Sequence, residues 1–215
     1  MVLFSKVVTA GVEAMLDFSI GQGSVAGIVT SREIESEVIA RLLLGFLAPV
    51  DGTVSVAGVQ PSGLNDKDLS DFRRRVGVIY HDGGFISNLN VWENLTLQLS
   101  YDGSAKKAEI EERGMNCLET VGYKGALHVL PSRLSIFERR QIAFARAFLM
   151  RPAVMIYQST LDGLSRSEQN QLSSLALSYH GQGGERTSLF LTSYLDSLRG
   201  IQADIIYNTG GANQS

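Results

Sequence analysis

The sequence lacks several features that would mark a secreted, membrane-spanning or nucleic-acid-binding protein. Its 215 residues include one cysteine, Cys117, so an intramolecular disulfide is excluded. No run reaches the roughly 18 to 20 apolar residues that a membrane-spanning helix needs. Acidic residues outnumber basic ones by 22 to 19, so the basic excess typical of a nucleic-acid binder is missing. Met1 to Ala10 has no charged stretch followed by an apolar one, so we expect no signal peptide.

What is present is the composition of an ordinary folded domain. Hydrophobic residues make up 44% of the chain and charged residues 19%, which excludes a largely disordered protein. The chain shows no repeat, no low-complexity tract and no linker rich in proline or serine. We therefore predict a single domain over residues 1–215.

Short apolar runs alternate with helical patterns along the chain. Val2–Val8 and Ala14–Ile20 predict a β-hairpin region, and Val25–Val29 predicts a buried strand followed by an amphipathic helix that ends near Phe46. Further runs typical of strands are Thr53–Val56, Val76–Tyr80, Val154–Tyr157, Ser188–Leu191 and Ile205–Tyr207. Strands that alternate with helices predict a largely parallel sheet. The long helical pattern between the strands at Val76 and Val154 predicts an inserted subdomain over residues 84–151.

Four stretches, in this order and spacing, resemble the ATP-binding cassette (ABC) ATPase family. Leu43–Val54 is similar to the family's "LLGLLxPxxGxV" segment, and Arg73–Tyr80 to the strand before its Q-loop. Asn90–Leu95 is similar to "TVxENV", and Glu138–Phe148 to the helix after the signature motif. The match covers nearly the whole chain. It implies an α/β fold with a RecA-like P-loop NTPase core, an N-terminal antiparallel β subdomain and an inserted α-helical subdomain.

A narrower resemblance concerns the Q-loop. Asp82–Phe85, followed by Asn88–Val91, is similar to the Q-loop of Mla/Mce-type phospholipid transporters. By that analogy the transported substrate is expected to be a lipid.

The resemblance places the phosphate-binding loop at Thr30–Glu37, where the family pattern G-x-x-x-x-G-K-[ST] is not kept. The glycines of that pattern let backbone N–H groups wrap the phosphates, the lysine neutralises charge and the hydroxyl binds magnesium. Glycines, lysine and hydroxyl are all replaced, and the residues at the altered positions are Thr30, Glu33, Glu35, Ser36 and Glu37.

The three glutamates make the loop unfavourable for a phosphate. Each would repel a phosphate by about 1 kcal/mol at 4 Å in water. Thr30 and Glu33 also have the spacing of a capping box, which predicts an ordinary capped helix start. We therefore expect a structural loop rather than a divergent nucleotide site.

The other hydrolytic motifs are also altered. Walker B, which normally supplies two carboxylates, falls at Gln158 and Ser159, and neither can act as a carboxylate base. The switch histidine position holds Ser193, and the Q-loop glutamine position holds His81. A shifted alignment could move Asp162 into the Walker B region, but no Gly-Lys-Ser/Thr exists to restore the phosphate loop. These replacements predict a pseudo-ATPase with no cofactor of its own, ATP and magnesium being held only by an intact partner subunit.

The signature motif "LSGGQ" appears as Leu134–Glu138. Ser135 is kept, but Ile136 and Phe137 replace both glycines, and side chains there would hinder a γ-phosphate. Either Ser135 caps the partner's nucleotide weakly, or Ile136 and Phe137 pack against a partner surface. We favour the second interpretation.

By resemblance, the chain docks on an integral membrane permease around His81–Val91 and pairs with a second ABC ATPase subunit at the cytoplasmic face of the membrane. His81, Asp82, Phe85 and Trp92 are the candidate docking residues. Phe85 and Trp92 fit a groove or an anchor of the helical subdomain equally well, and for His81 an ordinary loop histidine is the rival interpretation. The rival functions are an active ATPase with a rebuilt site and a soluble interaction protein that kept the fold.

Overall fold

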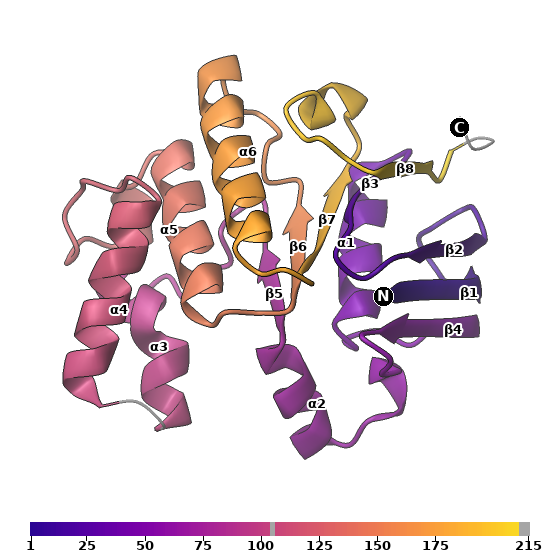
Figure 1. Ribbon diagram of the computed structural model, residues 1–215, viewed down its shortest axis with the longest axis horizontal. Coiled ribbons are helices and arrows are strands. Elements are labelled where there is room, and N and C mark those ends of the chain that lie inside the picture. Colours follow the sequence, from indigo (N-terminus) through magenta and orange to yellow (C-terminus); the bar gives the residue numbers. More distant parts are fainter. Residues whose placement is uncertain (104–105, 211–215) are drawn as a thin grey trace.

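The computed structural model describes residues 1–103 and 106–210 (Figure 1). An antiparallel sheet is formed by β2 (Leu16–Ile20), β1 (Val2–Val8) and β4 (Asp51–Val56), with β1 in the middle. Val2 of β1 faces Ile20 of β2 on one side and Val56 of β4 on the other. The predicted hairpin region at the start of the chain is confirmed.

A second sheet of five strands has the order β5-β6-β7-β3-β8, and every neighbouring pair is parallel. Its strands are β3 (Val25–Val29), β5 (Val76–Ile79), β6 (Val154–Gln158), β7 (Thr187–Thr192) and β8 (Ile205–Asn208). Each coincides with a predicted strand to within a residue. β3, β6 and β7 are buried along their whole length, as expected for parallel strands covered on both faces.

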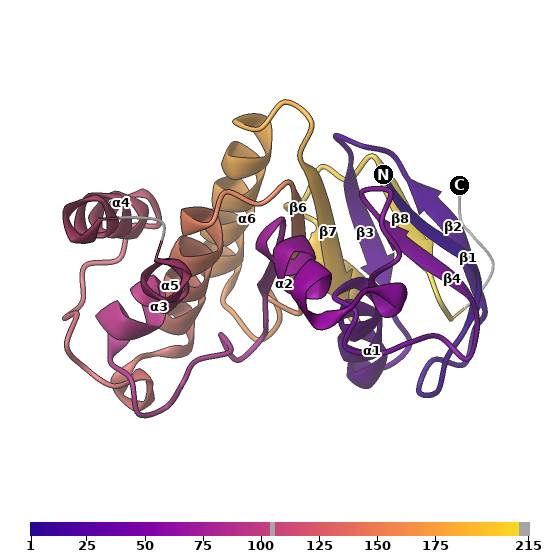
Figure 2. The same cartoon turned by 90° about the horizontal axis from the view of Figure 1, so that it is seen from below.

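The helices are α1 (Glu33–Leu43), α2 (Asp66–Arg74), α3 (Val91–Asp102), α4 (Lys107–Thr120), α5 (Ile136–Leu149) and α6 (Arg166–Gly181). Short 3₁₀ turns occupy Pro61–Gly63, Pro131–Arg133 and Leu195–Leu198. Figures 1 and 2 show α3 and α4 at one end of the molecule and the antiparallel sheet at the other.

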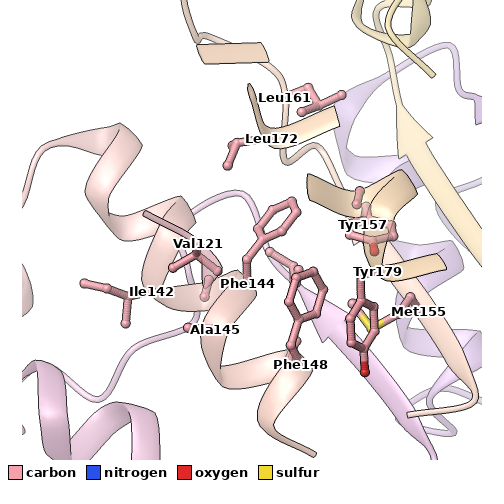
Figure 3. Close-up of a cluster of buried hydrophobic side chains, with 14 of the residues drawn as sticks. Val121, Ile142, Phe144, Ala145, Phe148, Met155, Tyr157, Leu161, Leu172 and Tyr179 are labelled. Atoms are coloured by element: carbon pink, nitrogen blue, oxygen red, sulfur yellow. The ribbon is translucent and has the colours of Figure 1, made fainter. Parts of the chain in front are cut away.

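Two apolar clusters hold these layers together. In the first, α1 packs through Ile39 and Leu43 between the antiparallel sheet and the parallel sheet. In the second, α5 and α6 cover the sheet around Phe144 and Tyr157 (Figure 3). Its rings stack closely: the centroids of Phe148 and Tyr179 are 3.7 Å apart, and those of Tyr157 and Phe190 are 4.3 Å apart.

The predicted fold class is confirmed by this arrangement of an antiparallel sheet, a parallel sheet and flanking helices. The helical pattern between β5 and β6 resolves into α3, α4 and α5. Residues 83–90 are not helical: they form an irregular segment, and α3 begins only at Val91.

Helix α6 has no counterpart among the predicted elements. It is polar apart from a thin buried stripe that includes Leu172, Ala176 and Tyr179, so its periodicity is weak. A sequence signal was nevertheless there: Ser165 and Glu168 form a capping box. Asn90 with Glu93, and Ser135 with Glu138, start α3 and α5 in the same way.

Candidate functional site

The parallel strands bring the predicted motif positions to one edge of the sheet. The backbone N–H of Thr30, after β3, donates to the carbonyl of Thr192 at the end of β7 (2.8 Å). The N–H of Ser159, after β6, donates to the carbonyl of Leu191 (2.8 Å). The loop after β3 and the ends of β6 and β7 are therefore neighbours, as the resemblance implies.

The loop after β3 is organised around the side chain of Glu35, which is 1% exposed. One carboxylate oxygen, Oε2, accepts from the backbone N–H of Ser31 (3.0 Å) and from the hydroxyl of Thr209 (3.1 Å). The other, Oε1, accepts from the Arg32 guanidinium, with Nη2 at 3.3 Å. The carboxylate thus faces into the loop and is bonded there.

This arrangement corrects the prediction for the start of α1. Thr30 and Glu33 do not form a capping box: the N-cap is Arg32, without a side-chain cap, and the Thr30 hydroxyl donates to the carbonyl of Arg32 (3.0 Å). Glu33 and Glu37 are exposed, and Glu37 lies 3.8 Å from Arg41. The spacing matched the capping pattern, but it is Glu35, two residues further on, that points inward and accepts a backbone N–H, that of Ser31.

A chain of neutral side chains joins three of the altered motifs. The Ser36 hydroxyl donates to the carbonyl of Glu33 (2.7 Å) and accepts from Gln158 Nε2 (3.0 Å). Gln158 Oε1 in turn accepts from the backbone N–H of His81 (3.3 Å). The Ser159 hydroxyl lies 3.4 Å from that of Ser36. Gln158 at the Walker B position thus bonds both to Ser36 at the lysine position and to His81 at the Q-loop position.

Ser159 has a left-handed backbone, with φ of +49°, at the end of β6. A side chain in this region costs about 1 to 3 kcal/mol and persists where surrounding contacts impose it. Here the contacts are its N–H bond to β7 and its burial to 1% exposure. The strain marks this strand end as a constrained point of the site.

The family resemblance implies ATP and magnesium, and the loop can be tested against them. Thr30–Glu37 contains no lysine. The Ser31 N–H already binds the Glu35 carboxylate, and Ser36 already binds Gln158. As the loop stands, these residues do not fit a magnesium-bound triphosphate, because the donors are taken and an anion lies among them.

Two further residues contact the site: Asp162, which a shifted alignment would have moved into the Walker B region, and Thr209. Asp162 follows β6 by four residues and accepts from Thr192 Oγ1 (2.9 Å) and Ser197 Oγ (2.6 Å). It therefore fixes the segment after β7, next to the switch position Ser193, and is not the carboxylate that ends β6. No sequence signal marked Thr209, whose contact with Glu35 spans 174 residues.

His81 and Asp82 line a cavity of about 470 Å³ beside the loop. Both side chains are exposed, and the cavity reaches Glu37, Arg41 and Gln158. His81 and Asp82 therefore lie between the altered phosphate loop and the surface.

Phe85 and Trp92, both candidate docking residues, make different contacts. Phe85 lies under Arg146 of α5, whose guanidinium carbon is 5.1 Å from the ring centroid and whose Nη1 donates to the carbonyl of Gly84 (2.8 Å). Trp92 instead packs against Gly114 of α4, so tightly that a Cβ at that glycine would lie 2.8 Å from its ring. The contacts of Trp92 are those of an anchor of the helices, whereas Phe85 lies in the segment that Arg146 joins to α5. A role of either residue in a groove for a membrane partner stays a prediction.

The altered signature motif lies at the start of α5. Ser135 is its N-cap and accepts from the N–H of Glu138 (3.2 Å). Ile136 is 59% exposed, whereas Phe137 is half-buried against the core. Of the predicted partner-facing pair, Ile136 alone presents a large apolar surface to solvent.

The family description for ABC transporters matches residues 16–159, more than half of the chain. The methionine import ATP-binding protein MetN of Francisella tularensis subsp. holarctica is 27% identical over 186 residues, covering 86% of this chain and 53% of the relative. MetN 1 of Rhodopseudomonas palustris is 27% identical over 205 residues, covering 94% and 54%. The chain spans about half the length of these curated relatives.

Solved structures show the same fold. A dimeric ATP-binding cassette, MJ0796, described as a post-hydrolysis state bound to ADP and Pi, matches with a TM-score of 0.85 at 18% identity, covering 100% of this chain and 97% of the other. CbiO1 of Clostridium perfringens, described as part of the ABC transporter complex cbiONQ, matches with a TM-score of 0.79 at 17% identity, covering 96% and 83%.

These comparisons contradict the prediction that the chain is not an enzyme. The relatives are named ATP-binding proteins, and a matched cassette is described in a post-hydrolysis state. We therefore set the pseudo-ATPase interpretation aside. The Mla/Mce-type assignment gains no support from relatives named for methionine import, and the placing of ATP and magnesium only in a partner subunit stays an untested prediction.

The match to the family description, the relatives and the shared architecture agree with one another. The chain belongs to the ABC transporter family.

Proposed function

We propose that this chain is the cassette subunit of an ABC import system, docking on an integral membrane permease and pairing with a second cassette subunit. The relatives' names supply import as the direction and methionine as the substrate class to test first. Within residues 1–103 and 106–210, no helix combines the length and apolar character that crossing a bilayer requires. In this proposal the permease holds the chain at the inner face of the membrane.

The observation that carries the docking proposal is a groove between the parallel sheet and the helices that follow β5. It has a volume of about 520 Å³ and is bounded by β5, α3 and α5. Four exposed apolar side chains line it: Phe46 (53% exposed), Ile86 (45%), Leu97 (41%) and Tyr101 (92%). Such a gathering of apolar side chains at a hollow is typical of a protein-binding site.

Two arginines fix the walls of this groove. Arg146 donates to the carbonyls of Gly83 and Gly84 and so holds the Q-loop segment against α5. Arg73 donates to the carbonyl of Leu44 (2.9 Å) and lies over the ring of Phe46, with 3.7 Å to the centroid. The groove is therefore formed before a partner arrives, which lowers the entropic cost of binding.

The lining suits a short amphipathic helix of a permease. Apolar side chains on one face of such a helix would pack against Ile86 and Leu97, in the helix-in-groove mode. An acidic residue at its edge would meet the positive charge of Arg73 and Arg146. Burial raises the pKa of Tyr80, against the opposing effect of Arg146, so this phenol stays neutral in the groove. We propose residues 84–151 as the subdomain that carries the outer wall.

The second subunit is proposed to face the start of α5. Ile136 offers an exposed apolar side chain there, beside the N-cap Ser135. A membrane importer with two cassettes would use this surface between subunits and the groove toward the permease, so the two contacts do not compete.

Isolation of the native assembly tests the proposal. We expect the affinity-tagged chain, extracted in a mild detergent, to co-purify with a permease and a cassette subunit identified by mass spectrometry. Recovery of the chain alone and monomeric, from membranes in which the permease is present, would contradict it. Uptake of labelled methionine by cells with and without the chain then tests the substrate class.

Nucleotide binding is the second part of the proposal and is supported by the relatives' names. Photo-crosslinking with labelled ATP in the isolated assembly shows which subunit carries the nucleotide. Labelling of this chain would support the proposal that it binds nucleotide as its relatives are named to do. Labelling confined to other subunits would contradict it.

A further inference from the structure

We propose that the Glu35 carboxylate is a resident anion of the phosphate loop, which a phosphate group must displace before it can bind there. The loop does not match the nucleotide that its family implies, and this mismatch is independent of the permease groove and of the direction of transport.

The carboxylate takes the kinds of donor that phosphate-binding loops offer to anions. A backbone N–H just before a helix, that of Ser31, donates to Oε2 at 3.0 Å. A hydroxyl, that of Thr209, donates to the same oxygen at 3.1 Å, and the Arg32 guanidinium faces Oε1. Backbone N–H groups before a helix start are the common anion site of such loops.

The side chain reaches these donors because of where it stands. Glu35 occupies the position immediately before Ser36, which in the pattern G-x-x-x-x-G-K-[ST] belongs to a glycine. A glycine leaves that space to the ligand, whereas Glu35 fills it with its own carboxylate and buries it to 1% exposure. A buried carboxylate is tolerated only where such donors satisfy it.

The C-terminal end of β8 closes the loop over this anion. Thr209 donates through its N–H to the carbonyl of Val29 (2.9 Å), and through its hydroxyl to Glu35. Gly210 lies so near that a Cβ there would collide with the Ser31 hydroxyl. Arg32, on the open side, is also bonded to Glu13 at 3.1 Å. An incoming phosphate would therefore meet a closed loop and a like charge on the same donors.

Binding of inorganic pyrophosphate to purified variants tests the proposal. Glu35→Gln keeps the shape and removes the charge, and Glu35→Gly empties the space. Glu37→Gln is the matched control, because it removes the same charge from an exposed site two residues away. By isothermal titration, we expect both Glu35 variants to bind pyrophosphate at least tenfold more tightly than the wild type and Glu37→Gln. Equal affinities across all four proteins would overturn the proposal and leave Glu35 with a structural role in the loop only.

A measurement on the unaltered protein keeps the proposal testable if the Glu35 variants do not fold. In ligand-free wild type, the Ser31 amide is expected to exchange with solvent at least tenfold more slowly than the neighbouring amide of Arg32, because Glu35 accepts from Ser31. A Ser31 amide that exchanges as fast as that of Arg32 would show that the carboxylate does not occupy the loop in solution.

Discussion

The loop after β3 and the groove beside α3 differ in whether their side chains already have partners within the chain. In the loop, Glu35, Ser36 and Gln158 are buried and bonded to one another or to nearby backbone. In the groove, Ile86 and Leu97 stay open to solvent although the walls around them are fixed. The loop satisfies itself within the chain, and the groove leaves apolar surface for a partner.

This difference indicates which of the two regions gains free energy when another molecule binds. Buried polar groups that have found partners add specificity to the fold and gain little from a ligand. Exposed apolar groups on a rigid frame gain from burial, about 25 cal/mol for each Å² removed from water. The largest consequences of substitution on binding should therefore lie in the groove, and those on stability in the loop.

The largest expected effect follows from charging the groove. We expect Ile86→Asp combined with Leu97→Asp to weaken permease binding about 100-fold, near 2.7 kcal/mol, because a carboxylate would be buried in an apolar contact. Binding to the permease in detergent by surface plasmon resonance measures this.

Val50→Asp is the matched control, since Val50 is 77% exposed and does not line the groove. It should bind the permease as the wild type does. If the double variant also binds normally, the groove is not the docking surface and the contrast between the two regions fails.

The loop is tested by Glu35→Ala. Removal of the carboxylate leaves the Ser31 N–H without its acceptor and the Thr209 hydroxyl with only a long contact to the Val29 carbonyl (3.5 Å). We therefore expect the unfolding free energy to fall by about 1 to 3 kcal/mol. Urea denaturation measures the change. Glu37→Ala should stay within about 0.5 kcal/mol, because its side chain is exposed. Equal losses in both variants would mean that the buried contacts of Glu35 add nothing.

Alkaline pH tests the contribution of the core to stability without changing the loop. On β6, Tyr157 packs in the core with the helices, whereas the next residue, Gln158, bonds to the loop. Burial raises the pKa of Tyr157 far above its usual range. The ionised form therefore favours the unfolded chain, and the stability from Tyr157 is complete below about pH 10 and is lost as the pH rises further. We expect Tyr157→Phe to remove about 1 kcal/mol of the decline between pH 10 and 11.

The control for this titration is Tyr101→Phe, because Tyr101 is 92% exposed. Its stability should decline with pH as that of the wild type does. Urea denaturation at each pH measures the unfolding free energy. If this free energy declines equally with pH in Tyr157→Phe and wild type, Tyr157 does not contribute to the decline.

The smallest effect is expected at His81, which lies between the two regions. Its ring nitrogen Nδ1 is 3.4 Å from Gln158 Oε1, and its side chain is exposed. We expect His81→Ala to change unfolding free energy by less than about 0.5 kcal/mol. The same variant in the permease binding assay is informative: a tenfold loss would assign His81 to the docking surface, and no change would assign it to the loop.

Much of the framework could be read from the sequence because it depends on local patterns. Apolar runs at Val25–Val29 and Val154–Tyr157 are long enough to be buried strands and too short for helices. The signals failed where burial is slight, as in α6, or where an irregular segment precedes a helix cap, as in residues 83–89 before Asn90. Hydrophobic periodicity in a sequence reflects burial, so a helix with a thin buried stripe shows only weak periodicity.

The site shows the limit more sharply. The sequence identified Glu35, Ser36 and Gln158 as altered positions, but it assigned the helix cap to Thr30 and Glu33. It could not show that Glu35 turns inward, because the acceptor's partners include Thr209, far away in the chain. The inference from altered residues to absent activity went further than the residues allowed and was contradicted by the relatives.

The sequence by itself determined the order of the strands along the chain, the family and the residue types at each motif, because these follow from local pattern and composition. The tertiary structure alone decided which polar groups satisfy each other and which apolar groups stay open. That outcome depends on segments brought together by the parallel sheet, where contacts within about 3 Å join residues more than 100 positions apart.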